Sequence, residues 1–154
     1  MMFDRLAALF GDDAPPAPHE DRLPLAAAVL LVEAARMDGI FDDDERRAIH
    51  TLLTWRFEMA DDDVRSLIDA ADAEADQLVE LSTYVRTIKN RFSHDERVEL
   101  IEMMWTVVYV DGRLDDYEAN LMRRVAGLLY VSDMESGAAR KRVLERLDLG
   151  GDTE

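Results

Sequence analysis

Two short acidic segments hold the side chains whose types and spacing could bind a ligand. Residues 37–45 read Met-Asp-Gly-Ile-Phe-Asp-Asp-Asp-Glu and residues 110–118 read Val-Asp-Gly-Arg-Leu-Asp-Asp-Tyr-Glu, at an offset of 73 residues. Each segment gathers three carboxylates around one Asp-Gly turn: Asp38, Asp42 and Glu45 in the first, Asp111, Asp115 and Glu118 in the second. Sites built only of oxygen ligands suit hard divalent cations such as Ca²⁺, Mg²⁺ or Mn²⁺. One interpretation is therefore a cation site at each turn.

Neither segment is an EF-hand. That loop takes ligands from positions 3 and 12, among others. Counting from Asp38 places isoleucine at both positions, and counting from Asp111 places Arg113 and Met122 there. Two ligand positions fail in each copy, so a cation would have to be held by a different arrangement.

Helix capping is the alternative interpretation of the same residues. Each glycine would end one helix, and Asp42 and Asp115 would cap the next helix, with Glu45 and Glu118 completing capping boxes. Asp38 and Asp111 remain unexplained, since a carboxylate at the C-terminal end of a helix costs roughly 0.3–1 kcal/mol. The sequence leaves both interpretations open: a cation site, or turns that are only capped and solvated.

Composition removes several other kinds of chemistry. The 154 residues contain no cysteine, which excludes disulfides and thiol chemistry, and the net charge of −16 disfavours binding to nucleic acids. The three histidines, at positions 19, 50 and 94, form no His-Glu-x-x-His pattern, and no glycine-rich phosphate loop is present. We therefore expect that the protein is not an enzyme.

The elements that must position the acidic turns read as helices throughout, so the fold class is predicted as all-α. Helical spacing of apolar residues predicts about seven helices in a compact bundle over residues 21–149. Capping boxes are predicted at Ser93 and Ser132, and the helix from Asp95 to Val110 has too many apolar positions for a single stripe. We expect this helix to be central and mostly buried. The 73-residue offset continues on both sides of the turns, which indicates a duplicated helical hairpin.

Residues 1–20 read as a short amphipathic helix followed by a proline-rich tether. Met2, Phe3, Leu6, Leu9 and Phe10 share one helical face. This arm could dock on its own domain or on a sister subunit, or it could anchor a partner or a membrane surface. Membrane association is disfavoured, because the arm has one cation and the longest apolar run of the chain is about half of a membrane span. We expect a cytoplasmic protein without a signal peptide.

The duplicated motif resembles the tellurite-resistance TerB-like family. The resemblance rests on Ala34-Ala35-Arg36-Met37-Asp38-Gly39 with Asp42-Asp43-Asp44-Glu45-Arg46, and on the echo at residues 110–118, and it covers about residues 23–147. It implies a compact bundle of about seven helices, in a cytoplasmic protein linked to stress response or tellurite tolerance. It also implies metal binding by the six acidic residues named above. Tyr117 replaces the acid that the first copy has at Asp44, so two such sites need not be equivalent.

Two functional hypotheses follow. The first is a divalent-cation-binding stress module that passes ion occupancy to a protein partner. The second is a metal-free protein–protein interaction domain that uses the N-terminal helix or an acidic face. In both, the partner is unidentified, and a homodimer is left open.

Overall fold

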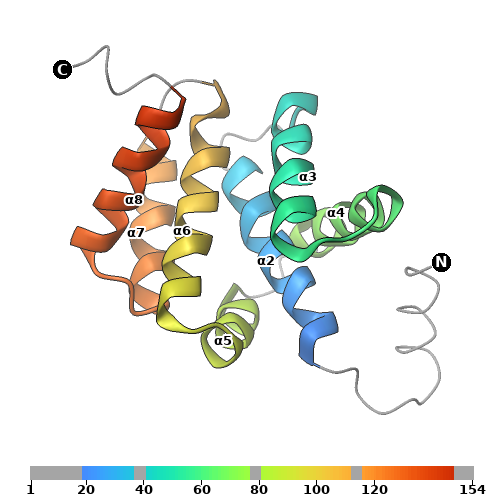
Figure 1. Ribbon diagram of the computed structural model, residues 1–154, viewed down its shortest axis with the longest axis horizontal. Helices are drawn as coiled ribbons and strands as arrows, with labels where there is room; N and C mark the ends of the chain where they lie inside the picture. The colour runs from blue at the N-terminus through green and yellow to red at the C-terminus, as the bar shows by residue number, and fades with distance from the viewer. Residues whose placement is uncertain (1–18, 37–40, 77–80, 112–115, 148–154) are drawn as a thin grey trace.

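The computed structural model describes residues 19–36, 41–76, 81–111 and 116–147. These residues form seven α-helices and no strand, which confirms the all-α prediction (Figure 1). The helices are α2 (His19–Ala35), α3 (Asp43–Phe57), α4 (Asp61–Asp76), α5 (Leu81–Arg91), α6 (His94–Val108), α7 (Asp116–Leu128) and α8 (Asp133–Arg146). A 3₁₀ turn, η2 (Tyr109–Asp111), extends α6. The N-terminal arm lies outside the described residues.

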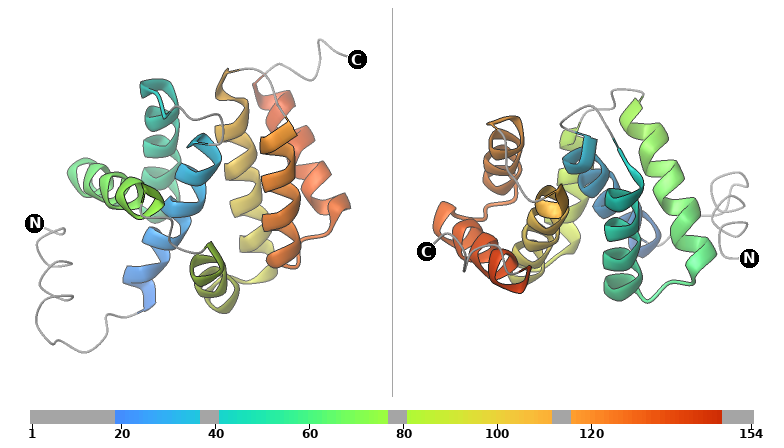
Figure 2. Two further views of the ribbon diagram at one scale, coloured as in Figure 1. Left: turned by 180° about the vertical axis from the view of Figure 1, so that it is seen from behind. Right: turned by 90° about the horizontal axis from the view of Figure 1, so that it is seen from above.

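Helix α2 is the centre of one half of the bundle. Its residues from Ala26 to Ala35 are buried, apart from the partly exposed Glu33. The helix packs against α3, α4, α5 and α6 (Figure 2). Five of the buried residues are alanines, which allow neighbouring helices to approach closely. The helix begins at His19, so Pro24 lies inside it and not in its first turn. The missing proline N–H removes one intrahelical hydrogen bond near the helix start.

Helix α6 is the centre of the other half, and its predicted burial is confirmed. Leu100, Ile101, Met104, Val107 and Val108 are each at most 2% exposed. The helix packs against α2, α7 and α8. Burial of apolar side chains contributes about 25 cal/mol per Å² removed from water, so these two helices supply much of the driving force for folding.

Short polar motifs set the helix starts, as the sequence predicts. Ser93 Oγ accepts a hydrogen bond from the Glu96 N–H at 3.2 Å, and Glu96 Oε1 accepts one from the Ser93 N–H at 2.8 Å. Ser132 and Glu135 form the same reciprocal pair, with both distances at 3.0 Å. Each box satisfies two N–H groups that the helix itself leaves without partners.

The helical hairpins α2–α3 and α6–α7 turn at the same end of the bundle. Figure 1 shows that α2 and α6 run towards this end, and that α3 and α7 begin there and run back. The view from behind agrees (Figure 2). The 3₁₀ turn η2 also contacts α3. The described residues that flank the two Asp-Gly turns are therefore gathered on one side of the molecule.

Within the part of the chain that the structure describes, no helix is long and apolar enough to cross a membrane.

Candidate functional site

The first acidic turn leads directly into α3 through a capping box. Asp42 Oδ1 accepts a hydrogen bond from the Glu45 N–H at 2.8 Å, and Glu45 Oε1 accepts one from the Asp42 N–H at 3.1 Å. Asp42 has an extended backbone, as an N-cap requires. The capping that the sequence predicts for these two residues is therefore present.

Two glutamates at corresponding places in the acidic segments are buried. Glu45 is the third residue of α3 and is 4% exposed, and Glu118 is the third residue of α7 and is 3% exposed. Fully buried glutamates are rare, because removing a carboxylate from water is costly unless it is paired. Both have interaction partners in the fold. The positive end of each helix dipole also favours a negative charge at this position.

The other predicted ligands lie wholly or partly outside the described residues. Asp38 and Asp115 lie outside the described residues. The backbone of Asp111 ends η2, but its side chain is outside the description. Among the residues that the structure does describe, no group of three or more acidic or histidine side chains could hold a metal ion. The cation sites at the two turns therefore stay predictions.

His50 and His94 each lie next to a carboxylate of a neighbouring helix. His50 Nε2 is 2.7 Å from Asp61 Oδ1, and His94 Nε2 is 2.7 Å from Glu135 Oε2. The hydrogen bond from His94 lowers the pKa of the Glu135 carboxyl, and the Ser132 backbone N–H lowers it further. His50 thus links helix α3 to α4, and His94 links α6 to α8.

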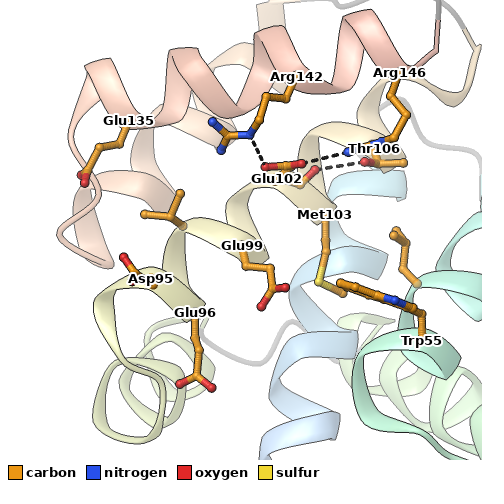
Figure 3. A pocket seen from close by; sticks show the side chains of 12 residues that line it. Trp55, Asp95, Glu96, Glu99, Glu102, Met103, Thr106, Glu135, Arg142 and Arg146 are labelled. Atoms are coloured by element: carbon orange, nitrogen blue, oxygen red, sulfur yellow. Dashed lines mark hydrogen bonds and ion pairs between the residues drawn. The ribbon is translucent and has the colours of Figure 1, made fainter.

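A second feature, which the sequence did not reveal, is an open groove between α3, α6 and α8, with a volume of about 740 Å³ (Figure 3). We call it the α6 groove. Its twelve lining residues come from three helices: Leu52 and Trp55 of α3; Asp95, Glu96, Val98, Glu99, Glu102, Met103 and Thr106 of α6; and Glu135, Arg142 and Arg146 of α8.

The indole of Trp55 forms the α3 side of this groove. It is 64% exposed, whereas the neighbouring Leu53 is fully buried. Figure 3 shows Trp55 and Met103 pointing towards one another from α3 and α6. A signal for Trp55 was present in the sequence, because it falls outside the buried positions of its helix, Ile49 and Leu53, where a large apolar residue has no core to enter.

Some of the charged side chains that line the groove are paired with an opposite charge, and others are not. Glu102 accepts hydrogen bonds from Arg142 Nε at 2.8 Å and from Arg146 Nη1 at 3.0 Å, so both arginines of the groove are used on one carboxylate. Arg56, which is not a lining residue, lies 3.1 Å from Glu96 Oε2 and 3.1 Å from Glu99 Oε1. Asp95 makes no hydrogen bond or ion pair with the described residues. The groove therefore has an excess of negative charge.

Glu96 is, with Glu135, one of two carboxyl groups of the groove whose pKa is shifted. The hydrogen bond from the Ser93 backbone N–H holds the pKa of Glu96 below its usual 4.5, and the nearby Arg56 guanidinium lowers it further. Both interactions favour the charged form, so Glu96 is ionised at neutral pH.

Fold and site together define a class of protein, a small all-α module in which two helical hairpins turn at one end of the bundle and a buried glutamate lies near the start of the second helix of each. Comparison with known families is more specific. The family model described as tellurite resistance protein TerB matches residues 24–141, which is most of the chain. The protein therefore belongs to the TerB family, as its acidic turns suggested.

Two further comparisons concern individual proteins. A crystal structure of a protein of unknown function from Porphyromonas gingivalis W83 is similar in fold, with a TM-score of 0.55 and 22% identity. The match covers 77% of this chain and 88% of that one. At this identity the similarity concerns the fold alone. No curated protein matches the sequence.

Proposed function

We propose that the protein is a non-enzymatic module of the tellurite-resistance and stress-response type that binds divalent cations at its two Asp-Gly turns. The residues that would hold the ions are Asp38, Asp42 and Glu45 at the first turn, and Asp111, Asp115 and Glu118 at the second. One observation carries the proposal. Glu45 and Glu118, at corresponding places in the two segments, are both buried where α3 and α7 begin, at the same end of the bundle.

The exposed carboxylate of Asp42, which caps the helix beside the buried Glu45, has unused capacity for a ligand. An ionised carboxylate offers about four lone-pair sites. The capping box uses one oxygen of Glu45 and one of Asp42, which leaves the second oxygen of Asp42 for another partner. A divalent cation there would offset the cost of burying charge and the repulsion among neighbouring acids. The ion would neutralise the carboxylates and cross-link the residues of each turn. A partner protein in the cytoplasm would then recognise the ion-loaded turns.

A thermal-shift titration with CaCl₂, MgCl₂ and MnCl₂ tests this function. A ligand present at 100 times its Kd stabilises by about 2.7 kcal/mol, which corresponds to roughly 5–10 °C in Tm for a domain of this size. The double variant Asp38→Asn/Asp111→Asn removes two proposed ligands and leaves both predicted N-caps intact. We expect it to abolish the rise in Tm.

The matched control is Asp62→Asn/Asp133→Asn, which removes the same charge from two exposed positions in the first turns of α4 and α8. This control should retain the full rise in Tm. The absence of any rise with all three ions at millimolar concentration would refute the cation-binding function. An equal loss in the control would show that the ions only screen the net charge.

A metal-free interaction module is the second candidate function. It is favoured by Trp55, whose large apolar side chain is 64% exposed beside a groove and has no role in the core. Exposed aromatic side chains of this kind are enriched at protein interfaces. The N-terminal arm is the other predicted contact of this hypothesis. Deleting residues 1–18 should reduce partner recovery in a pull-down, with unchanged helicity by circular dichroism, and unchanged recovery would count against the arm.

A further inference from the structure

We propose that the α6 groove is a docking site for a basic amphipathic helix of a partner protein. This proposal deepens the second candidate function by assigning it a surface and a class of ligand, and it does not depend on the cation sites.

The shape of the groove fits a helix. The α6 side chains that line it include Asp95, Val98, Glu99, Glu102, Met103 and Thr106. Their spacing of three and four residues places them on one face of α6. This open face runs for about 17 Å, the length of three helical turns. Since α3 and α8 flank it (Figure 3), a ligand helix of that length could lie along α6 between two walls.

The floor and one wall of the groove provide apolar contacts. Leu52 and Val98 are partly buried, Met103 is 4% exposed, and Trp55 stands at the edge with most of its surface in water. Covering an exposed tryptophan is among the most favourable changes that an interface can make, and a neighbouring methionine adapts to varied ligand side chains. These residues would receive the apolar face of the ligand helix.

The charge of the groove selects the polar face of the ligand. Five carboxylates and two guanidinium groups line it, and both guanidinium groups are paired with Glu102. Asp95 is exposed and without a partner among the described residues, and Glu99 shares Arg56 with Glu96. Lysine or arginine side chains on the ligand would meet these carboxylates, whereas an acidic helix or an anionic membrane surface would be repelled by them and by the net charge of −16.

Fluorescence anisotropy with three synthetic peptides of about 14 residues tests the proposal. The first peptide contains leucine on one helical face and lysine elsewhere. The second has glutamate in place of every lysine, and the third has the composition of the first with its leucines dispersed around the helix. All measurements are made on the full chain in EDTA, so that cation binding plays no part. We expect saturable binding of the first peptide only, which weakens as salt concentration rises.

Two groove variants and one control locate the binding site. Trp55→Ala and the double variant Asp95→Asn/Glu99→Gln should each weaken binding about tenfold or more. The control Asp44→Asn/Asp62→Asn removes the same charge from exposed positions on α3 and α4, away from the groove, and should change the Kd less than about twofold. Circular dichroism would show that each variant keeps its helix content, which is expected because the altered side chains are outside the core.

Intrinsic tryptophan fluorescence provides a second measure of peptide binding. The chain has two tryptophans, Trp55 in the groove and Trp105 buried in the core at 6% exposure. Peptide binding should shift the emission of the wild-type protein to shorter wavelength, and Trp55→Phe should lose that shift.

Four results would overturn the proposal. Equal weakening by the control would show attraction to net charge alone, and equal binding of the dispersed peptide would show that no helical face is recognised. Peptide affinity that rises about tenfold when residues 1–18 are deleted would assign the groove to the N-terminal segment of this chain. Concentration-dependent dimerisation that Trp55→Ala abolishes would assign it to a second copy. The cation-binding function would stand in each case, since it is tested separately.

Discussion

The indole N–H of Trp105 donates a hydrogen bond to Ser136 Oγ at 3.1 Å inside the contact between α6 and α8. Both residues are buried, at 6% and 7% exposure. The ring of Trp105 also stacks on Tyr109, with the guanidinium of Arg140 over both rings. This buried polar bond adds a directional contact to an interface that also contains apolar side chains and the exposed pairs of Glu102 with Arg142 and Arg146.

This bond makes Ser136 a stability determinant. Ser136→Ala should lower the free energy of unfolding by about 1–2 kcal/mol, because it leaves a buried N–H without an acceptor. Trp105→Phe should cost more, through the lost ring volume and the unpaired hydroxyl. In urea unfolding, the double variant should be less destabilised than the two single variants together, by about 1 kcal/mol. Strict additivity would show that the bond contributes nothing.

Two substitutions of Asp42 distinguish its role as a helix cap from its proposed role as a cation ligand. Asp42→Ala should cost about 1 kcal/mol of stability, because it removes the acceptor for the Glu45 N–H. Asp42→Asn keeps an equivalent acceptor, so it should cost less than about half as much. If the turn binds a divalent cation, Asp42→Asn should nevertheless reduce the ion-dependent rise in Tm. Full retention of that rise would remove Asp42 from the proposed ligands.

The Glu96 carboxyl should make the free energy of unfolding depend on pH under acidic conditions. Its pKa in the folded protein lies below the usual 4.5, so the unfolded chain takes up a proton first as the pH falls. The stabilisation is therefore complete above about pH 4.5 and is lost as the pH drops through the folded-state pKa. Glu96→Gln retains the capping box and loses the charge. Because the side chain is 42% exposed, the difference at neutral pH should stay below about 1 kcal/mol.

Urea titrations between pH 7 and the onset of acid unfolding provide the measurement for Glu96. The difference in free energy of unfolding between wild type and Glu96→Gln should be greatest at neutral pH and should disappear in acid. Glu145→Gln is a suitable control, because the side chain of Glu145 is exposed and has no polar partner among the described residues. A gap that stays constant with pH would mean that the Ser93 and Arg56 contacts do not stabilise the charged form.

Local signals in the sequence predicted much of the fold because they act locally in the structure too. The capping boxes at Asp42, Ser93 and Ser132 involve residues only three positions apart, so their chemistry needs no knowledge of the tertiary structure. Burial of α6 was predictable for a similar reason, since a helix that is apolar on all sides can be stable in water only when other elements surround it.

The α6 groove was not predictable, because it depends on how far apart α3 and α8 lie on either side of α6. That distance is set by packing among side chains from three helices, and no spacing in the sequence encodes it. Trp55 was visible as an apolar residue outside the buried face of its helix, but its neighbours across the groove, Met103 and Arg146, come from other helices. The burial of Glu118 likewise depends on tertiary packing around α7.

The burial of residues 26–35 of α2 has a consequence for synthesis of the protein. Residues 26–32 form an uninterrupted apolar segment, and α6, which covers part of it, is completed about 75 residues later. At roughly 5–20 residues per second, this interval lasts about 4–15 s. During that time α2 has no complete core to enter, and its apolar surface is available to chaperones or to other nascent chains. The helix at the centre of one half of the folded domain is thus also exposed to aggregation before the domain is complete.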